Sequence, residues 1–327
     1  MSDLNNAPRV LVCRRLPVAV EDRLSLGFRA TLCAEAHGLA RDRLLERVAD
    51  HDALCPTVAD RIDREVIERA APRVRIIANF GVGHDNIDLE AARAAGIVVS
   101  NTPGVLTDAT ADLAIALMLA AARRLGEGER LCRSGEWNGW QPTQLLGVDL
   151  HGKTLGLVGF GRIGRAVARR ARHGFGMRLV TFTRSALDAA TRQQFEVEQC
   201  ASLENLLKRS DFVSLHCPST AQTRHLIDGA ALAAMKAGAI LINTARGDLV
   251  DEAALARALR EGGIRAAGLD VHEHEPALNP QLLDLENVVL LPHLGSATLE
   301  TRMAMGMRMV DNLTAFFETG AAPDRVA

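Results

Sequence analysis

The 327-residue sequence has no tyrosine and only two tryptophans, and aromatic residues make up 3% of it. It also lacks an apolar run of the roughly 20 residues that a membrane-spanning helix requires. The first residues, Met1 to Pro8, are polar and contain no hydrophobic signal segment. No run of lysine or arginine forms a surface for nucleic acid, and the formal net charge is −2. We therefore expect a soluble, cytoplasmic protein that binds neither nucleic acid nor membrane.

The six cysteines also lack a metal-binding pattern, because none belongs to a CxxC pair or has another spacing typical of metal ligands. They stand at positions 13, 33, 55, 132, 200 and 217. We interpret them as reduced thiols, most of them buried, as is usual for a cytoplasmic protein.

The length favours two α/β domains. In the first hundred residues, short apolar runs at 10–13, 53–55, 74–78 and 97–100 alternate with helical patterns such as 39–49 and 88–95. This alternation predicts a parallel sheet with helical crossovers. A long Ala- and Leu-rich helix is expected at 107–124, and a Met- and Ala-rich helix at 298–317.

A glycine-rich turn is the strongest local signal. The apolar run 155–158 leads into GFGRIG at residues 159–164 and then into a helical pattern. Three glycines at this spacing allow a tight turn, a close approach of backbone N–H groups to a pyrophosphate, and close packing of helix on strand. Such a turn also occurs in ordinary loops, but here a buried strand precedes it and a helix follows. We expect Gly159, Gly161, Arg162, Ile163 and Gly164 to bind a dinucleotide.

In the second half of the chain, the apolar runs 212–215, 239–242, 266–269 and 288–291 each end in polar or special residues. The carboxyl ends of parallel strands lie along one edge of the sheet, where ligands bind. One crevice should therefore collect the glycine turn with Arg246, Asp270, Glu275 and His293.

These side chains suit the reduction of an α-keto acid. Arginine binds a carboxylate with its planar fork and stays charged. Histidine can give a proton to a developing alkoxide, and a neighbouring carboxylate favours its protonated form. Arg246 could instead pair at a surface loop. The sequence HEHE at 272–275 could form a metal cluster, but hydride transfer needs no metal and we expect none.

Several longer motifs carry a family resemblance. They are GVGHDNID at 81–88, TPGVLTDATAD at 102–112, the glycine turn, NTARG at 243–247, the segment 268–276 and PHLGSAT at 292–298. Together they resemble the D-isomer-specific 2-hydroxyacid dehydrogenases, and most closely the glyoxylate and hydroxypyruvate reductases. The resemblance covers almost the whole chain.

The resemblance implies a fold and a site. A Rossmann cofactor domain, residues 102–297, would be inserted in a discontinuous, flavodoxin-like substrate domain of residues 1–101 and 298–327, both with doubly wound parallel sheets. Arg246 would clamp the substrate, Glu275 and His293 would form the acid–base pair, and the N–H groups of Val82 and Gly83 would bind the substrate carboxylate. The hinges would lie near residues 101–103 and 295–298.

One position departs from the commoner NAD-binding pattern. About 20 residues beyond the glycine turn, an NAD enzyme usually has an acidic residue that binds the ribose. This chain has Thr183, followed by Arg184 and Ser185. A cation and hydroxyls would attract a 2′-phosphate, so NADPH is the preferred cofactor, with NADH as the second choice. The other expected cofactor contacts are His216, Cys217, Pro218, Thr244, Asp270 and Gly295, and His216 and Cys217 would pack beside the adenosine.

Both tryptophans, Trp137 and Trp140, lie in one polar stretch. In the proteins that this chain resembles, the corresponding segment reaches a partner subunit, which implies a homodimer. Trp140, close to Pro142, would then close the substrate pocket of the neighbouring chain. The alternative is that both rings only fill the interface.

The sequence thus predicts an NADPH-preferring reductase that converts a small 2-keto acid, of the glyoxylate or hydroxypyruvate type, to the D-2-hydroxy acid. Two alternatives stay open. The substrate could be a longer sugar acid such as 2-ketogluconate, or the chain could be a dinucleotide-sensing binding module, although the complete set of Arg246, Glu275 and His293 argues against the latter.

Overall fold

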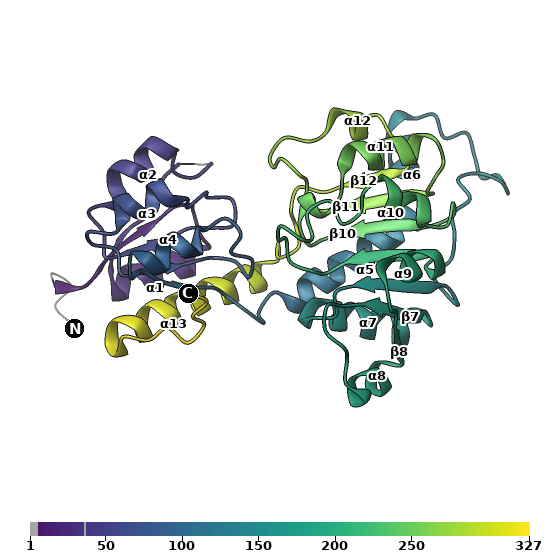
Figure 1. The fold of residues 1–327 in the computed structure, drawn as a ribbon. Coiled ribbons are helices and arrows are strands. Elements are labelled where there is room, and N and C mark those ends of the chain that lie inside the picture. The colour runs from purple at the N-terminus through teal and green to yellow at the C-terminus, as the bar shows by residue number, and fades with distance from the viewer. Residues whose placement is uncertain (1–5, 36) are drawn as a thin grey trace. The chain divides into compact units, whose positions relative to one another are not determined.

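The computed structural model describes residues 6–35 and 37–327. The expectation about the polar segment from Met1 to Pro8 therefore falls largely outside the described residues. The chain forms two compact units (Figure 1), the first made of residues up to 106 with 297–327, the second of residues 107–296. Within the first unit, Thr102 N–H donates to the Gly81 carbonyl at 3.0 Å.

The first unit is built on one parallel sheet with the strand order β2-β1-β3-β4-β5. This is the flavodoxin-like order. The strands are β1 (Arg9–Val12), β2 (Arg29–Thr31), β3 (Ala53–Cys55), β4 (Ile76–Ala78) and β5 (Val98–Ser100). At the β5 edge, Val326 N–H donates to the Val99 carbonyl, so the last residues of the chain cover an otherwise unpaired strand.

Helices cover both faces of this sheet, because successive strand side chains point to opposite sides. One face carries α2 (Arg41–Val48), α3 (Arg64–Ala70) and α4 (Leu89–Ala94). The other carries α1 (Val18–Gly27) and α13 (Leu299–Thr319), and the yellow α13 lies beside α1 in Figure 1. Gly306 of α13 permits this packing, since a Cβ there would lie 2.4 Å from Val20 Cγ2.

The second unit contains a larger parallel sheet with the order β12-β11-β10-β9-β6-β7-β8. Counted from β6, this is the Rossmann order with one further strand. The strands are β6 (Thr154–Val158), β7 (Arg178–Phe182), β8 (Val197–Gln199), β9 (Phe212–Leu215), β10 (Ile240–Asn243), β11 (Ala266–Leu269) and β12 (Val288–Leu290). The strand order reverses between the neighbouring central strands β6 and β9, because the chain crosses from β8 at one side of the sheet back to β9. Sheets of this kind bind ligands at the carboxyl ends of the strands beside such a reversal.

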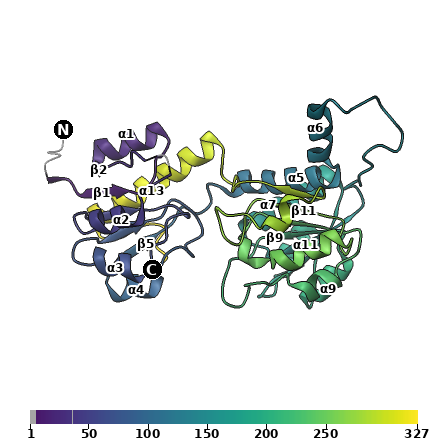
Figure 2. The ribbon, with the colours of Figure 1, turned by 90° about the horizontal axis from the view of Figure 1, so that it is seen from above.

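This sheet is also covered on both faces. One face packs on α5 (Thr107–Ala122) and α7 (Arg162–Phe175). The other packs on α9 (Leu203–Arg209), α10 (Gly229–Ala234), α11 (Glu252–Arg260) and α12 (Pro280–Leu283). The short α8 (Ala189–Phe195) follows β7, and α6 (Leu125–Ser134) extends from the body of this unit together with the segment after it (Figure 2). Both units thus have a parallel sheet with helices on its two faces, which confirms the predicted α/β class.

No helix formed by residues 6–35 and 37–327 is both long enough and apolar enough to cross a bilayer.

Candidate active site

The glycine turn connects β6 to α7 as the sequence predicts. Gly159 has φ +95°, and a Cβ there would lie 2.7 Å from the His216 backbone. Gly164 lies against the turn itself, where a Cβ would be 2.5 Å from the Gly159 carbonyl oxygen. Gly161 has open space around it and precedes the first turn of α7 without a side-chain cap. The first N–H groups of α7 are therefore directed at this open space, which fits a pyrophosphate.

Next along this edge, β7 ends in a turn that contains Thr183 and Ser185. Gln199 holds the turn, because its Nε2 donates to Thr183 Oγ1 at 3.0 Å and to the Ser185 carbonyl at 3.1 Å. Arg184 is exposed, and within the described part of the chain it has no ion pair. No carboxylate belongs to residues 183–185, so a negatively charged group is not repelled by these three side chains.

The loops after β9 and β10 lie beside the glycine turn. The backbone of His216 and Cys217 touches Gly159, and Pro218 follows with an exposed ring. Burial lowers the pKa of His216 to about 4, so its imidazole is neutral near pH 7, and it pairs with Ser214 Oγ at 2.9 Å. Burial also raises the pKa of the Cys217 thiol to about 11, which leaves an unreactive thiol for packing.

Thr244, after β10, is buried, and its Oγ1 has no hydrogen-bond partner among the residues that the structure describes. A buried hydroxyl without a partner is costly unless a ligand satisfies it. Together with the bare helix N-terminus of α7, this hydroxyl fits a dinucleotide at the carboxyl edge of the sheet.

The Asn243 side chain builds the turn that carries Arg246. Its Nδ2 donates to the Arg246 carbonyl at 2.7 Å, and its Oδ1 accepts from Ala245 N–H at 3.0 Å. Arg246 Nη1 also donates to the Ala245 carbonyl. At Gly247 a Cβ would lie 1.9 Å from the His272 carbonyl carbon, so only glycine lets the loop after β10 pack on the loop after β11.

Asp270, at the end of β11, holds the backbone that presents His293. Its carboxylate accepts from Leu294 N–H at 2.6 Å and from Gly295 N–H at 2.8 Å, while its carbonyl accepts from His293 N–H. Burial raises the pKa of Asp270, and the two N–H donors only partly offset this. Gly295 is fixed from the other side, because Thr110 Oγ1 donates to its carbonyl at 3.1 Å. The geometry gives Asp270 a positioning role beside the expected cofactor contact.

Glu275 and His293 meet as the sequence suggests. His293 Nδ1 lies 2.8 Å from Glu275 Oε2, and Glu275 Oε1 accepts from His272 N–H at 3.0 Å. Burial pushes the pKa of Glu275 upward, but the hydrogen bond and the charge of His293 outweigh it, so the pKa lies below its ordinary value. Both side chains are about one-third exposed, at 34% for His293 and 37% for Glu275. The second imidazole nitrogen of His293, Nε2, is thus left to face a ligand.

The acidic and histidine residues next to Glu275 in the sequence do not contact His293 in the described structure; His272 and Glu273 have other partners. His272 is buried, its Nε2 pairs with the Leu291 carbonyl, and Glu252 Oε1 lies 3.6 Å from its Nδ1. Glu273 pairs with His225 Nε2 at 2.7 Å, and His274 is exposed. In the described residues, no group of three or more potential ligands is arranged to hold a metal ion.

Val82 and Gly83 belong to the first unit, in the loop that follows β4. This loop is half-buried, and the Val82 carbonyl accepts from Asn101 Nδ2 at 2.8 Å. The tryptophans belong to the second unit, beyond α6, with exposed fractions of 54% for Trp137 and 81% for Trp140.

Some residues that build the site carried little signal in the sequence. Glu252 is buried and Gln199 half-buried, and their hydrogen-bond partners lie in other segments of the chain. Asn243 instead bonds within its own turn, to Ala245 and Arg246. Gly247 could have been noticed, because it follows Arg246 within the motif NTARG.

A Rossmann-ordered sheet with a glycine turn and a histidine–carboxylate pair at its carboxyl edge defines the class of nicotinamide-dependent dehydrogenases. Residues 115–295 match the family described as "D-isomer specific 2-hydroxyacid dehydrogenase, NAD binding domain". The chain is 48% identical to glyoxylate reductase of Thermococcus litoralis over 98% of this chain and 96% of that protein.

Solved structures agree with this match. A glyoxylate reductase from Paecilomyes thermophila superposes with a TM-score of 0.87 at 37% identity and covers 98% of both chains. The NADPH-dependent glyoxylate/hydroxypyruvate reductase of Sinorhizobium meliloti, in complex with NADP and malonate, gives a TM-score of 0.86 at 38% identity, over 98% of this chain and 97% of that one. The chain belongs to the D-isomer-specific 2-hydroxyacid dehydrogenases, a family of NAD(P)-dependent oxidoreductases.

Proposed function

We propose that this protein reduces a small 2-keto acid, glyoxylate or hydroxypyruvate, to the D-2-hydroxy acid and prefers NADPH. The observation that carries the proposal is the 2.8 Å pair of His293 Nδ1 and Glu275 Oε2 at the carboxyl edge of a dinucleotide-binding sheet. Relatives named as glyoxylate reductases support the choice of substrate.

In this proposal Arg246 binds the substrate carboxylate, as do the N–H groups of Val82 and Gly83. The guanidinium supplies two parallel donors and a permanent charge, which orient the keto acid and tighten its binding. The turn made by Asn243 limits the directions that the Arg246 backbone can take, so less entropy is lost on binding.

His293 gives its proton to the carbonyl oxygen as that oxygen becomes an alkoxide. Glu275 holds Nδ1 and leaves Nε2 to carry the transferred proton. The pKa of Glu275 lies below its ordinary value, so near neutral pH its side chain is a carboxylate that accepts this charge-assisted hydrogen bond. In the reverse direction His293 would accept the proton from the hydroxy acid.

The cofactor would be held by the glycine turn and the first turn of α7, by the loops after β7, β9 and β10, and by Asp270 and Gly295. The bound nicotinamide dinucleotide supplies the hydride. Thr183, Arg184 and Ser185 favour NADPH, because the turn offers hydroxyls and a cation where a 2′-phosphate would lie.

We further propose a homodimer, with α6 and the segment after it at the interface and Trp140 reaching the partner's substrate. The apolar exposure of this part supports it: Leu125 is 55% exposed and Leu146 is 59% exposed. Within the described residues, α6 buries none of its own side chains.

The test is a panel of 2-keto acids, each incubated with NADPH or NADH, in which the fall in the absorbance of the reduced cofactor measures the rate. Glyoxylate and hydroxypyruvate should be reduced faster than pyruvate or 2-ketogluconate, with the higher kcat/KM for NADPH. A preference for 2-ketogluconate would contradict the small-substrate proposal. If no keto acid is turned over although NADPH binds, the chain is a dinucleotide-sensing module instead.

A further inference from the structure

The loop after β4 presents its backbone in an unusual way. The carbonyl groups of Gly81, Val82 and Gly83 are each taken by a donor: Thr102 N–H at 3.0 Å, Asn101 Nδ2 at 2.8 Å and Asn79 Nδ2 at 2.8 Å, in that order. The donors lie together at the carboxyl ends of β4 and β5, where Asn79 N–H donates to the Ser100 carbonyl.

This arrangement fixes the direction of the N–H groups. In a planar trans peptide, the carbonyl and the N–H of the same unit point in opposite directions. Because the three carbonyls face the strand ends, the N–H groups of Val82, Gly83 and His84 face away from them. In the part of the chain that the structure describes, none of these three N–H groups meets an acceptor. Successive N–H groups that converge in this way form a concave site for an anion.

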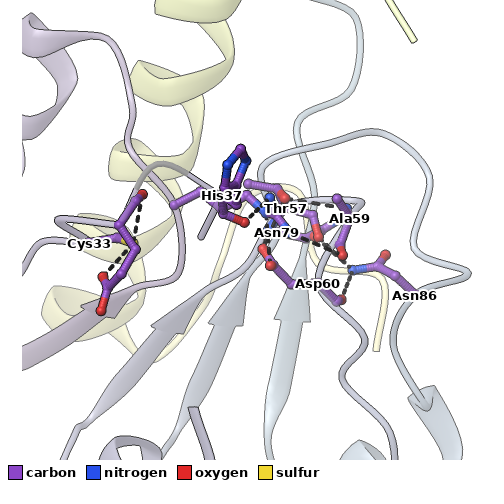
Figure 3. A network of polar contacts seen from close by, with 9 residues as sticks. Cys33, His37, Thr57, Ala59, Asp60, Asn79 and Asn86 are labelled. Atoms are coloured by element: carbon purple, nitrogen blue, oxygen red, sulfur yellow. Dashed lines mark hydrogen bonds and ion pairs between the residues drawn. The ribbon is translucent and has the colours of Figure 1, made fainter. Parts of the chain in front are cut away.

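Both ends of the loop are anchored, and Figure 3 shows the contacts at the end that contains Asn86. Asn86 Nδ2 donates to the carbonyls of Thr57 and Asp60 at 3.0 and 3.1 Å. The Asp60 side chain is only 5% exposed, and its Oδ1 accepts from Arg14 Nε at 2.9 Å. Its Oδ2 accepts from the N–H and the hydroxyl of Thr57. Arg14 in turn donates to the His37 carbonyl. The loop is therefore held by a polar network that exists before any ligand binds.

We propose that Asn79 and Asn101 are positioning residues for substrate binding: they turn three consecutive peptide N–H groups, including that of His84, toward the carboxylate of the keto acid. This rests on the proposed function, which names the carboxylate as the ligand. Both amides are buried, Asn79 with 1% and Asn101 with 9% of its surface exposed. Donors oriented in advance bind an anion without a cost for reorganisation.

The experiment compares Asn79→Ala and Asn101→Ala with the native protein. Each variant should raise the KM for glyoxylate about tenfold, and the inhibition constant of oxalate, a carboxylate that cannot be reduced, by a similar factor. The Kd for NADPH should not change, and kcat should fall less than KM rises. Asn287→Ala is the matched control, since its amide also donates to two backbone carbonyls, of Leu259 and Arg265, in the other unit. It should lower the melting temperature and leave KM unchanged.

Asn79→Asp and Asn101→Asp replace the alanine variants if those do not fold, because they keep the side-chain size but place an oxygen against the carbonyl. A general loss of structure would weaken NADPH binding as well, which the proposal does not predict. If the native protein reduces glyoxylate but the variants keep its KM and its affinity for oxalate, this inference is wrong and the proposed function stands. If the native protein reduces no 2-keto acid, both are wrong.

Discussion

His293 has a left-handed backbone, with φ +57°, and this conformation is rare for residues other than glycine. Asp270 enforces it by accepting hydrogen bonds from the next two N–H groups, those of Leu294 and Gly295. The imidazole is therefore oriented by the backbone as well as by Glu275. Strain of this kind persists only where the surrounding structure holds it, and it is common at functional sites.

His293→Asn tests the proton donor with little change to the backbone, because asparagine tolerates the left-handed region. We expect kcat for glyoxylate to fall by about 100-fold or more, the usual contribution of general acid catalysis. Steady-state kinetics with NADPH measures the loss. His274→Asn is the control, since His274 is exposed in the loop beside Glu275 and should have no effect. A native rate in His293→Asn would remove His293 from the mechanism.

Glu275→Gln tests the contribution of the carboxylate to the pair. The pKa of Glu275 lies below its ordinary value, so near neutral pH the side chain is a carboxylate beside His293 Nδ1. The amide keeps the size of the side chain but carries no charge, so it should support proton transfer by His293 less well, and kcat for glyoxylate should fall about tenfold. Glu273→Gln, whose carboxylate pairs with Arg224 and His225, should keep the native rate. A native rate in Glu275→Gln would contradict the account.

At the scale of elements, the ends of the strands matter more than their interiors. The turn after β7 decides the cofactor in our proposal, and Gln199 of β8 fixes its shape through Thr183 Oγ1 and the Ser185 carbonyl. The charge of this turn can be changed by substitutions at residues 183 and 184, which lie beyond the end of β7.

Thr183→Asp should raise the KM for NADPH about tenfold, because a carboxylate would repel the 2′-phosphate, while NADH is used as well as before or better. Arg184→Ala should weaken NADPH binding selectively. Fluorescence titration with each cofactor measures both effects. Arg192→Ala, at an exposed arginine of α8, should change neither value. If the unmodified protein uses NADPH and NADH equally, the interpretation of residues 183–185 is wrong.

Most central strands could be predicted from the sequence, because they are continuous apolar runs that end in polar residues. β3, β9 and β11 have the predicted bounds, and the other predicted strands differ by one or two residues at one end or, for β1 and β10, by one residue at both ends. β2 and β8 were not predicted: they are three-residue edge strands with one apolar residue each, Ala30 and Val197, so their pairing and not their composition makes them strands. α6 was also missed, since its two glycines weaken the helical pattern and, in the described structure, it buries no side chain.

For the candidate site, the residues that we propose to face ligands carry a clearer sequence signal than the residues that hold them in place. Arg246, Glu275 and His293 stand in recognisable motifs after strands. The amides of Asn79, Asn101 and Asn243 act on backbone carbonyls, and only the folded chain shows which carbonyls lie within reach. A hydrogen bond from a side chain to a backbone carbonyl leaves no periodic pattern in a sequence. This holds for the nearby carbonyls that Asn79 and Asn243 reach and for the more distant one that Asn101 reaches.

At the scale of the whole molecule, α6 and residues 135–147 carry several exposed large apolar side chains, Leu125, Trp137, Trp140 and Leu146. Patches of this kind commonly mark interfaces. An indole beside the substrate's third carbon would exclude long keto acids by its size.

Trp140→Ala should therefore leave a folded dimer with native NADPH affinity, yet raise the kcat/KM for bulkier keto acids relative to glyoxylate by about tenfold. Trp137→Ala is the matched control and should keep the native order of substrates. Light scattering gives the oligomeric state, and a substrate panel gives the order. A native order in Trp140→Ala, or a monomeric native protein, would exclude the role proposed for Trp140.

The central claim is that NADPH reduces a small 2-keto acid on this protein to the D-hydroxy acid. The most direct measurement incubates the native protein with hydroxypyruvate and NADPH, then determines the handedness and the amount of glycerate by chiral chromatography. We predict D-glycerate alone, in amounts equal to the NADP⁺ formed. Formation of L-glycerate, or unchanged hydroxypyruvate and NADPH, would contradict the account.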